Sequence, residues 1–146
     1  MPNKLKQLLS FVVLPIFITC IFVSCTGDWE YKLPNNYEIV RVNSQSIVFG
    51  KNNNSFDQTI DRYILEFCYN ENYIGLKRLP LDHVPADEIV DIDSLDRSSM
   101  EFYLIDAMKD KQYGPYTEEQ FTQKCNEIGT GNLGEWILTS DLEHSK

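Results

Sequence analysis

Apolar and polar residues alternate with a period of two through much of the chain after residue 28, and this pattern restricts that part to β-structure. Three pairs of runs rich in β-branched and aromatic residues are each separated by a short turn-forming segment, which is the signature of β-hairpins. The pairs are residues 37–42 with 46–49, 63–68 with 73–78, and 101–106 with 112–113. Three hairpins in series predict an antiparallel meander.

One helix is predicted after the third hairpin. Thr117 and Gln120 have the spacing of a capping box, and Gly129 is placed to end the helix. An apolar stripe at helical spacing lies between them: Phe121, Cys125 and Ile128. Residues 136–138 offer one further short strand. The sequence therefore predicts an α+β fold, an antiparallel β-meander of about six or seven short strands with one C-terminal helix packed on it.

The N-terminal segment has a different pattern. Lys4 and Lys6 precede an uncharged run over residues 8–23, which is the order of charge and hydrophobicity found in signal peptides. The stretch Phe-Val-Ser-Cys that ends at Cys25 resembles the lipobox of bacterial lipoproteins, with Phe22 where leucine is usual. The resemblance implies cleavage between Ser24 and Cys25 and transfer of a diacylglyceryl group to the Cys25 thiol, which becomes the new N-terminus.

This resemblance predicts three parts of the chain: a signal peptide over 1–24, a lipidated cysteine and tether over 25–30, and a single globular domain over 31–146. Three alternatives remain open. First, Cys20, preceded by Thr19, is a second possible lipobox cysteine. Second, residues 8–25 could remain as a membrane anchor, although Pro15 and the short length argue against it. Third, cleavage could occur without lipidation.

Charge limits the partners of the predicted mature chain. The whole chain carries a net charge of −9, from 22 acidic and 13 basic side chains. Removing Lys4 and Lys6 with the signal peptide leaves 22 acidic against 11 basic side chains, a net charge of −11. Such a domain is a poor partner for nucleic acid and is repelled by anionic headgroups, so the lipid must hold it on the membrane. We expect an extracytoplasmic protein, lipid-anchored to a bacterial membrane.

Cys68 and Cys125 are the remaining cysteines of that domain. Outside the cytoplasm they could form a disulfide, although two buried free thiols are the favoured interpretation. Cys125 lies on the apolar stripe of the predicted helix, whereas strand alternation places Cys68 on one face with Ile64 and Glu66. Gly75, in the neighbouring run, predicts a bulge or a close backbone approach.

Catalytic signals are weak. A nucleophilic Cys68 would have only His83 and His144 as candidate bases, and pairs of carboxylates cannot be placed across a cleft from sequence. Two histidines are too few for a zinc site, and the GxGxxG pattern at 129–134 follows a helix instead of opening one. Residues 91–96 faintly resemble a calcium loop, but Leu95 stands at the third ligand position and the glycine of the sharp turn is absent. No cofactor is predicted.

Two short segments resemble a family of small bacterial lipoproteins catalogued as domain of unknown function 3997. They are residues 31–37, Tyr-Lys-Leu-Pro-Asn-Asn-Tyr, and residues 113–119, Tyr-Gly-Pro-Tyr-Thr-Glu-Glu. The similarity extends over roughly residues 28–140. Relatives often carry glycine at the position of Asn36, and asparagine is the residue that tolerates positive φ best after glycine. The resemblance implies a lipoprotein and no particular chemistry.

These observations predict a lipid-anchored lipoprotein that serves as a binding or structural module of the cell envelope. Two alternatives are an envelope enzyme that uses Cys68 or paired carboxylates, and a weak calcium-dependent module built on residues 87–96.

Overall fold

The computed structural model describes residues 29–43, 46–80, 82 and 97–144. In this part of the chain nine strands form two antiparallel sheets. The first sheet has the order β1-β2-β3-β4, and the second has the order β8-β7-β6-β5-β9. The first-sheet strands are β1 (Trp29–Lys32), β2 (Tyr37–Asn43), β3 (Ser46–Asn52) and β4 (Phe56–Ile60). The second-sheet strands are β5 (Ile64–Tyr69), β6 (Tyr73–Arg78), β7 (Glu101–Asp106), β8 (Lys111–Tyr116) and β9 (Ile137–Leu138).

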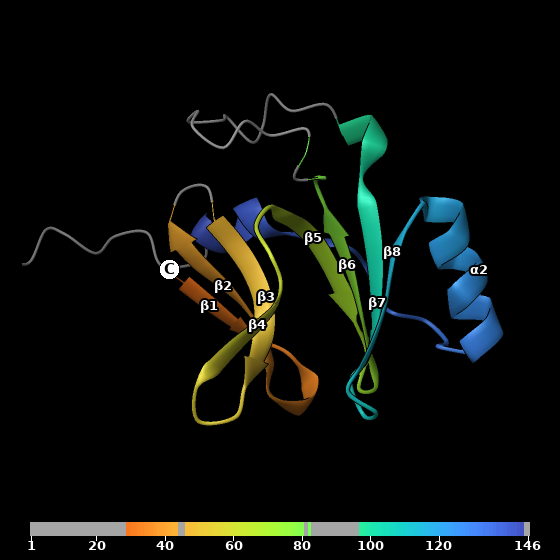
Figure 1. Cartoon of the computed structure of the whole chain (residues 1–146), viewed down its shortest axis with the longest axis horizontal. Coiled ribbons are helices and arrows are strands. Elements are labelled where there is room, and N and C mark those ends of the chain that lie inside the picture. Colours follow the sequence, from red (N-terminus) through yellow and green to blue (C-terminus); the bar gives the residue numbers. More distant parts are fainter. Residues whose placement is uncertain (1–28, 44–45, 81, 83–96, 145–146) are drawn as a thin grey trace, which may run out of the picture.

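The two sheets face each other, and helix α2 (Glu118–Ile128) covers the opposite face of the second sheet (Figure 1). Three short 3₁₀ helices complete the described structure: η1 (Pro34–Asn36), η4 (Arg97–Ser99) and η5 (Thr139–His144). The molecule thus has three layers, two of sheet and one of helix.

Each pair of layers encloses its own apolar core. Between the sheets the inward side chains are aromatic and β-branched, and Ile39, Phe49 and Phe67 are fully buried there. Between the second sheet and α2 a smaller cluster contains Cys68, Phe102, Leu104, Phe121 and Leu133. The central strands of the second sheet are therefore buried on both faces over most of their length, which explains the nearly continuous apolar runs of β5 and β7.

The fold class predicted from sequence is confirmed. The three hairpins are β2–β3, β5–β6 and β7–β8, and β9 lies within the predicted short strand. Helix α2 has the predicted capping box and ends at Gly129 in the left-handed conformation, with φ 74°. Strands β1 and β4 were not predicted. Both are edge strands. Four of the five residues of β4 are exposed, so β4 shows no alternation of apolar and polar residues, whereas β1 alternates but has only four residues.

Strand β1 begins at Trp29, so the predicted domain boundary at residue 31 falls inside a strand. Trp29 pairs with Arg41 and is 8% exposed, and its side chain belongs to the core between the sheets. The bulky apolar side chain of Trp29 has more to gain from burial than from serving in a polar tether.

The turn from β1 to β2 joins the two sheets. Asn35 and Asn36 both have positive φ, 56° and 63°, which asparagine tolerates better than most residues. This conformation brings the Asn35 side-chain amide to the backbone oxygen of Ala107, at the start of the β7–β8 turn. The hydroxyl of Tyr37 and the ammonium group of Lys51 both reach Asp110 in the same turn.

Candidate functional site

An open pocket of about 730 Å³ lies between the outer face of the second sheet and the N-terminal end of α2. Its floor includes one row of cross-strand neighbours, in which Glu66 pairs with Lys77, Lys77 with Phe102, and Phe102 with Tyr116. The other described lining residues come from the segment after β6, from η4 and the start of β7, and from the end of β8 and α2: Pro80, Asp82, Ser98, Ser99, Met100, Glu101, Pro115, Thr117, Glu118 and Gln120.

Lys77 lies at the centre of the row. Its ammonium nitrogen is 2.7 Å from Glu66 Oε2 and 4.1 Å from the centroid of the Trp136 ring, and its side chain is 16% exposed. The ring of Phe102 lies on its other side, at 5.8 Å. Contacts with a carboxylate and two aromatic rings compensate the charge of Lys77 for its partial loss of water.

A second ion pair borders the pocket. Arg78 Nε donates to Glu101 Oε2 across 3.0 Å, and the Tyr103 hydroxyl donates to the same oxygen at 3.0 Å. The guanidinium group lies 5.2 Å from the Tyr103 ring centroid. Burial is the main reason that the pKa of Tyr103 rises to about 12, so this hydroxyl remains protonated and keeps donating at neutral pH.

The start of α2 forms one wall. The Gln120 backbone N–H donates to Thr117 Oγ1 across 3.3 Å, and the Thr117 N–H donates to Gln120 Oε1 across 2.9 Å. Gly114 precedes this wall with φ 114°, and a Cβ there would lie 2.6 Å from the backbone oxygen of Phe102. Only glycine therefore fits where β8 passes β7 and turns into the wall.

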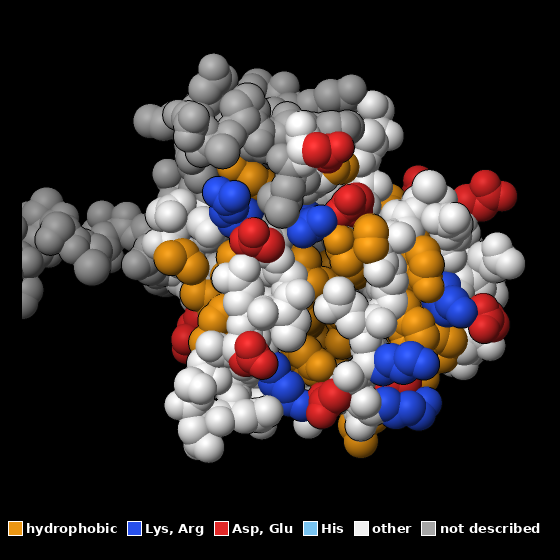
Figure 2. Space-filling view, viewed as in Figure 1, with side chains coloured by type: hydrophobic (Ala, Val, Ile, Leu, Met, Phe, Trp, Pro, Cys, Tyr) orange, Lys and Arg blue, Asp and Glu red, His pale blue; other side chains and the backbone are white. Residues whose placement is uncertain are grey.

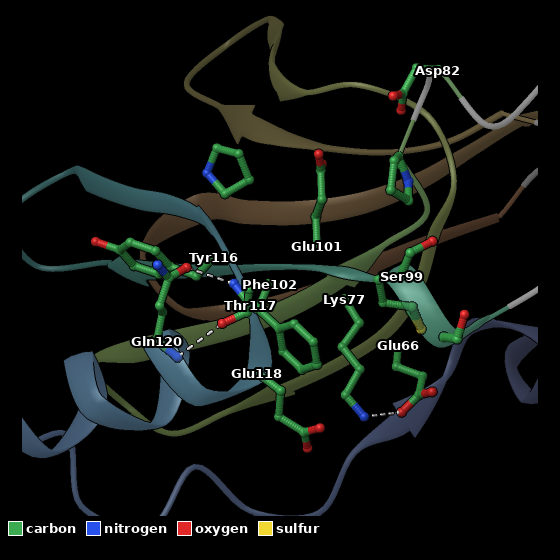
Figure 3. Close-up of a pocket in the computed structure, with 14 residues that line it drawn as sticks. Glu66, Lys77, Asp82, Ser99, Glu101, Phe102, Tyr116, Thr117, Glu118 and Gln120 are labelled. Carbon is green, nitrogen blue, oxygen red and sulfur yellow. Dashed lines mark hydrogen bonds and ion pairs between the residues drawn. The ribbon is translucent and has the colours of Figure 1, made fainter.

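Glu118 extends from this wall on the same side as Lys77 and Glu66, whereas Glu101 and Asp82 lie toward the other side (Figure 3). Within the part of the chain that the structure describes, the Glu118 side chain forms no hydrogen bond or ion pair. Four carboxylates and one ammonium group line the pocket, although acidic and basic side chains are interspersed over the face seen in Figure 2. The acidic side chains of the lining thus outnumber the basic one, and the apolar side chains of Met100 and Phe102 lie beside them.

The cysteines predicted as a possible disulfide both belong to the second core. Cys68 is 2% exposed and Cys125 half-buried, and both are free thiols in the structure. Burial raises the pKa of the Cys68 thiol to about 12, so Cys68 is a poor nucleophile at neutral pH. Gly75 confirms the predicted close approach, because a Cβ there would lie 2.8 Å from Cys68 Sγ.

One detail of the predicted placement of Cys68 is wrong. Cys68 shares the outer face of the second sheet with Glu66, but Ile64 belongs to the core between the sheets. The ladder of β5 with β6 shifts register between Ile64 and Glu66, and this irregularity moves Ile64 to the opposite face.

Several predicted features lie outside the described residues: Ser24, Cys25, the alternative Cys20, His83 and the acidic segment 87–96. The 129–134 pattern forms the end of α2 and the loop after it, as its position behind a helix indicates. No group of three acidic, histidine or cysteine side chains in the described ranges could hold a metal ion. Nor is any described helix long and apolar enough to cross a bilayer.

The pocket itself was not predicted. The pair of Glu66 and Lys77 could have been found by aligning the predicted hairpin 63–68 with 73–78, since these residues are opposite charges at facing positions. The contributions of Thr117 and Glu118 could not, because they depend on where the helix packs.

The fold and the pocket define a two-sheet antiparallel sandwich with one covering helix and a ligand-sized opening at the helix start. The chain belongs to the family described as protein of unknown function DUF3997, whose profile matches residues 34–133. Both segments used to recognise the family lie largely within the match. No curated protein and no solved structure was found to match the chain.

Proposed function

We propose that this protein is an extracytoplasmic lipoprotein anchored through Cys25, and that its sandwich domain is a binding module that takes its ligand in the pocket beside α2. The lipobox-like segment supports the anchor. The pocket supports the binding role and is the observation that carries it, because its volume of about 730 Å³ is that of a small-molecule or side-chain site.

The anchor would hold the domain close to the bilayer. Four peptide units separate Cys25 from Trp29, the first residue of β1, and such a segment spans at most about 14 Å. A net charge of −11 on the mature chain opposes binding to anionic headgroups, so membrane association would depend on the acyl chains.

Mass spectrometry of the membrane fraction tests the anchor. We expect the N-terminal peptide to start at Cys25 and to carry the mass of a diacylglyceryl group. The variant Cys25→Ser should lose this mass and its membrane association, whereas Cys20→Ser should keep both. A Cys25→Ser product that is processed and held on the membrane as firmly as the wild type would refute the anchor.

The pocket suits a ligand with a cationic group beside an apolar one. Benzamidinium combines both in a small molecule and is a suitable probe. Titration into the soluble domain, followed by the backbone amide resonances of Thr117 and Glu118, should give saturable shifts. We expect Glu118→Gln to weaken binding several-fold and Glu119→Gln to leave it unchanged.

These two variants are matched, because both remove one negative charge from the first turn of the same helix. Glu118 lines the pocket, whereas Glu119 is not among the lining residues. Equal weakening in both variants would indicate a general charge effect and would contradict binding in the pocket.

The two alternative functions receive less support. An enzyme that uses Cys68 would need a thiolate where burial raises the pKa to about 12. Among the carboxylates of the pocket, Glu66 and Glu101 are each engaged by a basic side chain. The calcium-dependent module depends on residues 87–96, which lie outside the described part.

A further inference from the structure

A buried carboxylate lies far from the pocket beside α2, on the first sheet. Glu38 is 4% exposed, although its side chain ends in a carboxyl group. Its Oε1 accepts a hydrogen bond from Asn52 Nδ2 across 3.0 Å, and among the described residues the Glu38 side chain has no other hydrogen bond and no ion pair. No described side chain supplies a cationic partner to Glu38. Burying a carboxylate without such a partner is costly, so the site favours a cation from outside the chain.

The carboxylate borders a small cavity of about 160 Å³ at the β1–β2 turn. Lys32, Leu33, Asn36, Tyr37, Glu38 and Asn52 line it. One water molecule occupies roughly 30 Å³ of liquid, so the cavity has room for a chemical group larger than a single water.

The amides beside the cavity have unused acceptors. Asn36 Nδ2 donates to Asn53 Oδ1 across 3.2 Å, and Asn52 uses its Nδ2 on Glu38. In both asparagines the side-chain oxygen accepts no hydrogen bond from a described residue. Asn36, whose φ is 63°, lines the cavity with its side chain bonded to Asn53. Glu38 Oε2 and the two amide oxygens thus offer three acceptors and a negative charge.

We propose that this cavity binds a primary alkylammonium group, the chemistry shared by a lysine side chain, a free amino terminus and a small amine. Such a group has one positive charge and three N–H donors, which match the carboxylate and the three acceptors. Leu33 and Tyr37 would contact the carbon atoms next to the nitrogen. A divalent ion fits less well, because one carboxylate is a small share of the six to eight oxygens that calcium takes.

Lys32 is the competing occupant within the chain. It faces Glu38 across the β1–β2 ladder, but its ammonium group lies 3.7 Å from Glu30 and its side chain is 79% exposed. The site is independent of the lipid anchor and of the pocket beside α2.

Titration of the soluble domain with n-butylammonium, followed by the side-chain amide resonances of Asn36 and Asn52, tests the proposal. We expect saturable shifts of both resonances. Glu38→Gln keeps an acceptor for Asn52 and removes the charge, and should weaken binding at least tenfold. Asp57→Asn removes an exposed carboxylate of the same sheet and should leave binding unchanged.

Two further titrations identify the donor. Tetramethylammonium has the charge without N–H donors and should cause no saturable shift, and Nα-acetyl-lysine amide should reproduce the effect of butylammonium. The proposal is overturned if butylammonium shifts persist in Glu38→Gln or if tetramethylammonium binds equally well. It is also overturned if binding appears only in Lys32→Met, because Lys32 would then be the occupant.

Discussion

The hydroxyl of Tyr37 donates a hydrogen bond to Oδ1 of Asp110 across 3.3 Å, and these residues are 73 positions apart in the chain. Tyr37 begins β2 in the first sheet, and Asp110 precedes β8 in the second. The same oxygen accepts a hydrogen bond from Lys51, so one carboxylate in a turn holds two residues of the opposite sheet. The Tyr37 ring also stacks on Phe49, with ring centroids 5.1 Å apart.

Removing the Tyr37 hydroxyl tests this link. We expect Tyr37→Phe to lower the free energy of unfolding by about 1 kcal/mol, the usual net contribution of one hydrogen bond. Denaturant unfolding measures the change. Tyr113→Phe is the control, because among the described residues the Tyr113 hydroxyl donates no hydrogen bond. An equal loss in both variants would mean that the bond to Asp110 contributes nothing specific.

Asp110 makes the same link dependent on pH. The hydrogen bond from Lys51 is the main reason that the pKa of Asp110 lies below its ordinary value. Its carboxylate therefore stabilises the fold above the ordinary aspartate pKa of about 4, and the contribution is lost as the pH falls through the lower native value. We expect the difference in melting temperature between the wild type and Asp110→Asn to be constant from pH 5 to pH 7. This range begins about one unit above the ordinary aspartate pKa. At lower pH the difference should shrink. A difference that stays constant into strong acid would contradict this assignment.

Gly75 lets α2 approach the second sheet. A Cβ at this position would lie 2.8 Å from Cys68 Sγ, 3.1 Å from Phe121 Cζ and 3.3 Å from Trp136 Cη2. We expect Gly75→Ala to destabilise the domain by about 1–3 kcal/mol, the range for overpacked cores. Cys68→Ala removes the nearest atom, so the double variant should lose less than the two single variants together. Strict additivity, measured by thermal unfolding, would argue against this contact.

The Cys68 thiol should be unreactive in the folded state. Because burial raises its pKa to about 12, almost none of it is thiolate at pH 8. We expect a thiol reagent such as dithionitrobenzoate to label Cys68 in the Cys25→Ser domain only at the rate of unfolding, and to label both remaining cysteines in denaturant. Rapid labelling of Cys68 in the native domain would show that the second core opens. If denaturant exposes no thiol until a reductant is added, Cys68 and Cys125 form a disulfide.

Local signals in the sequence were enough for the three hairpins and for the helix. The capping box of Thr117 and Gln120 and the left-handed Gly129 depend on contacts within a few residues, so their spacing in the chain predicts them. The same holds for Asn36, whose positive φ follows from its place in a tight turn. Strand β4 was missed because an exposed edge strand is not marked by a buried face.

The candidate sites were beyond sequence reasoning for a different reason. In the pocket beside α2, Lys77 and Trp136 are brought together only when the chain returns after α2 and places β9 beside β5. In the cavity of the first sheet, the acceptors around Glu38 meet only once Asn35 and Asn36 take their turn conformation. The register shift that moves Ile64 away from the face of Cys68 also has no local mark in the sequence.

The amino-acid sequence alone determined the antiparallel hairpins, the single helix, the membership of the family and the lipobox-like segment that motivates the anchor, because each depends on residues close together in the chain. The tertiary structure decided the division into two sheets, the burial of Cys68 and the location of both cavities. These depend on which faces pack against each other, and that choice minimises the exposed apolar area of the whole domain rather than of any one segment.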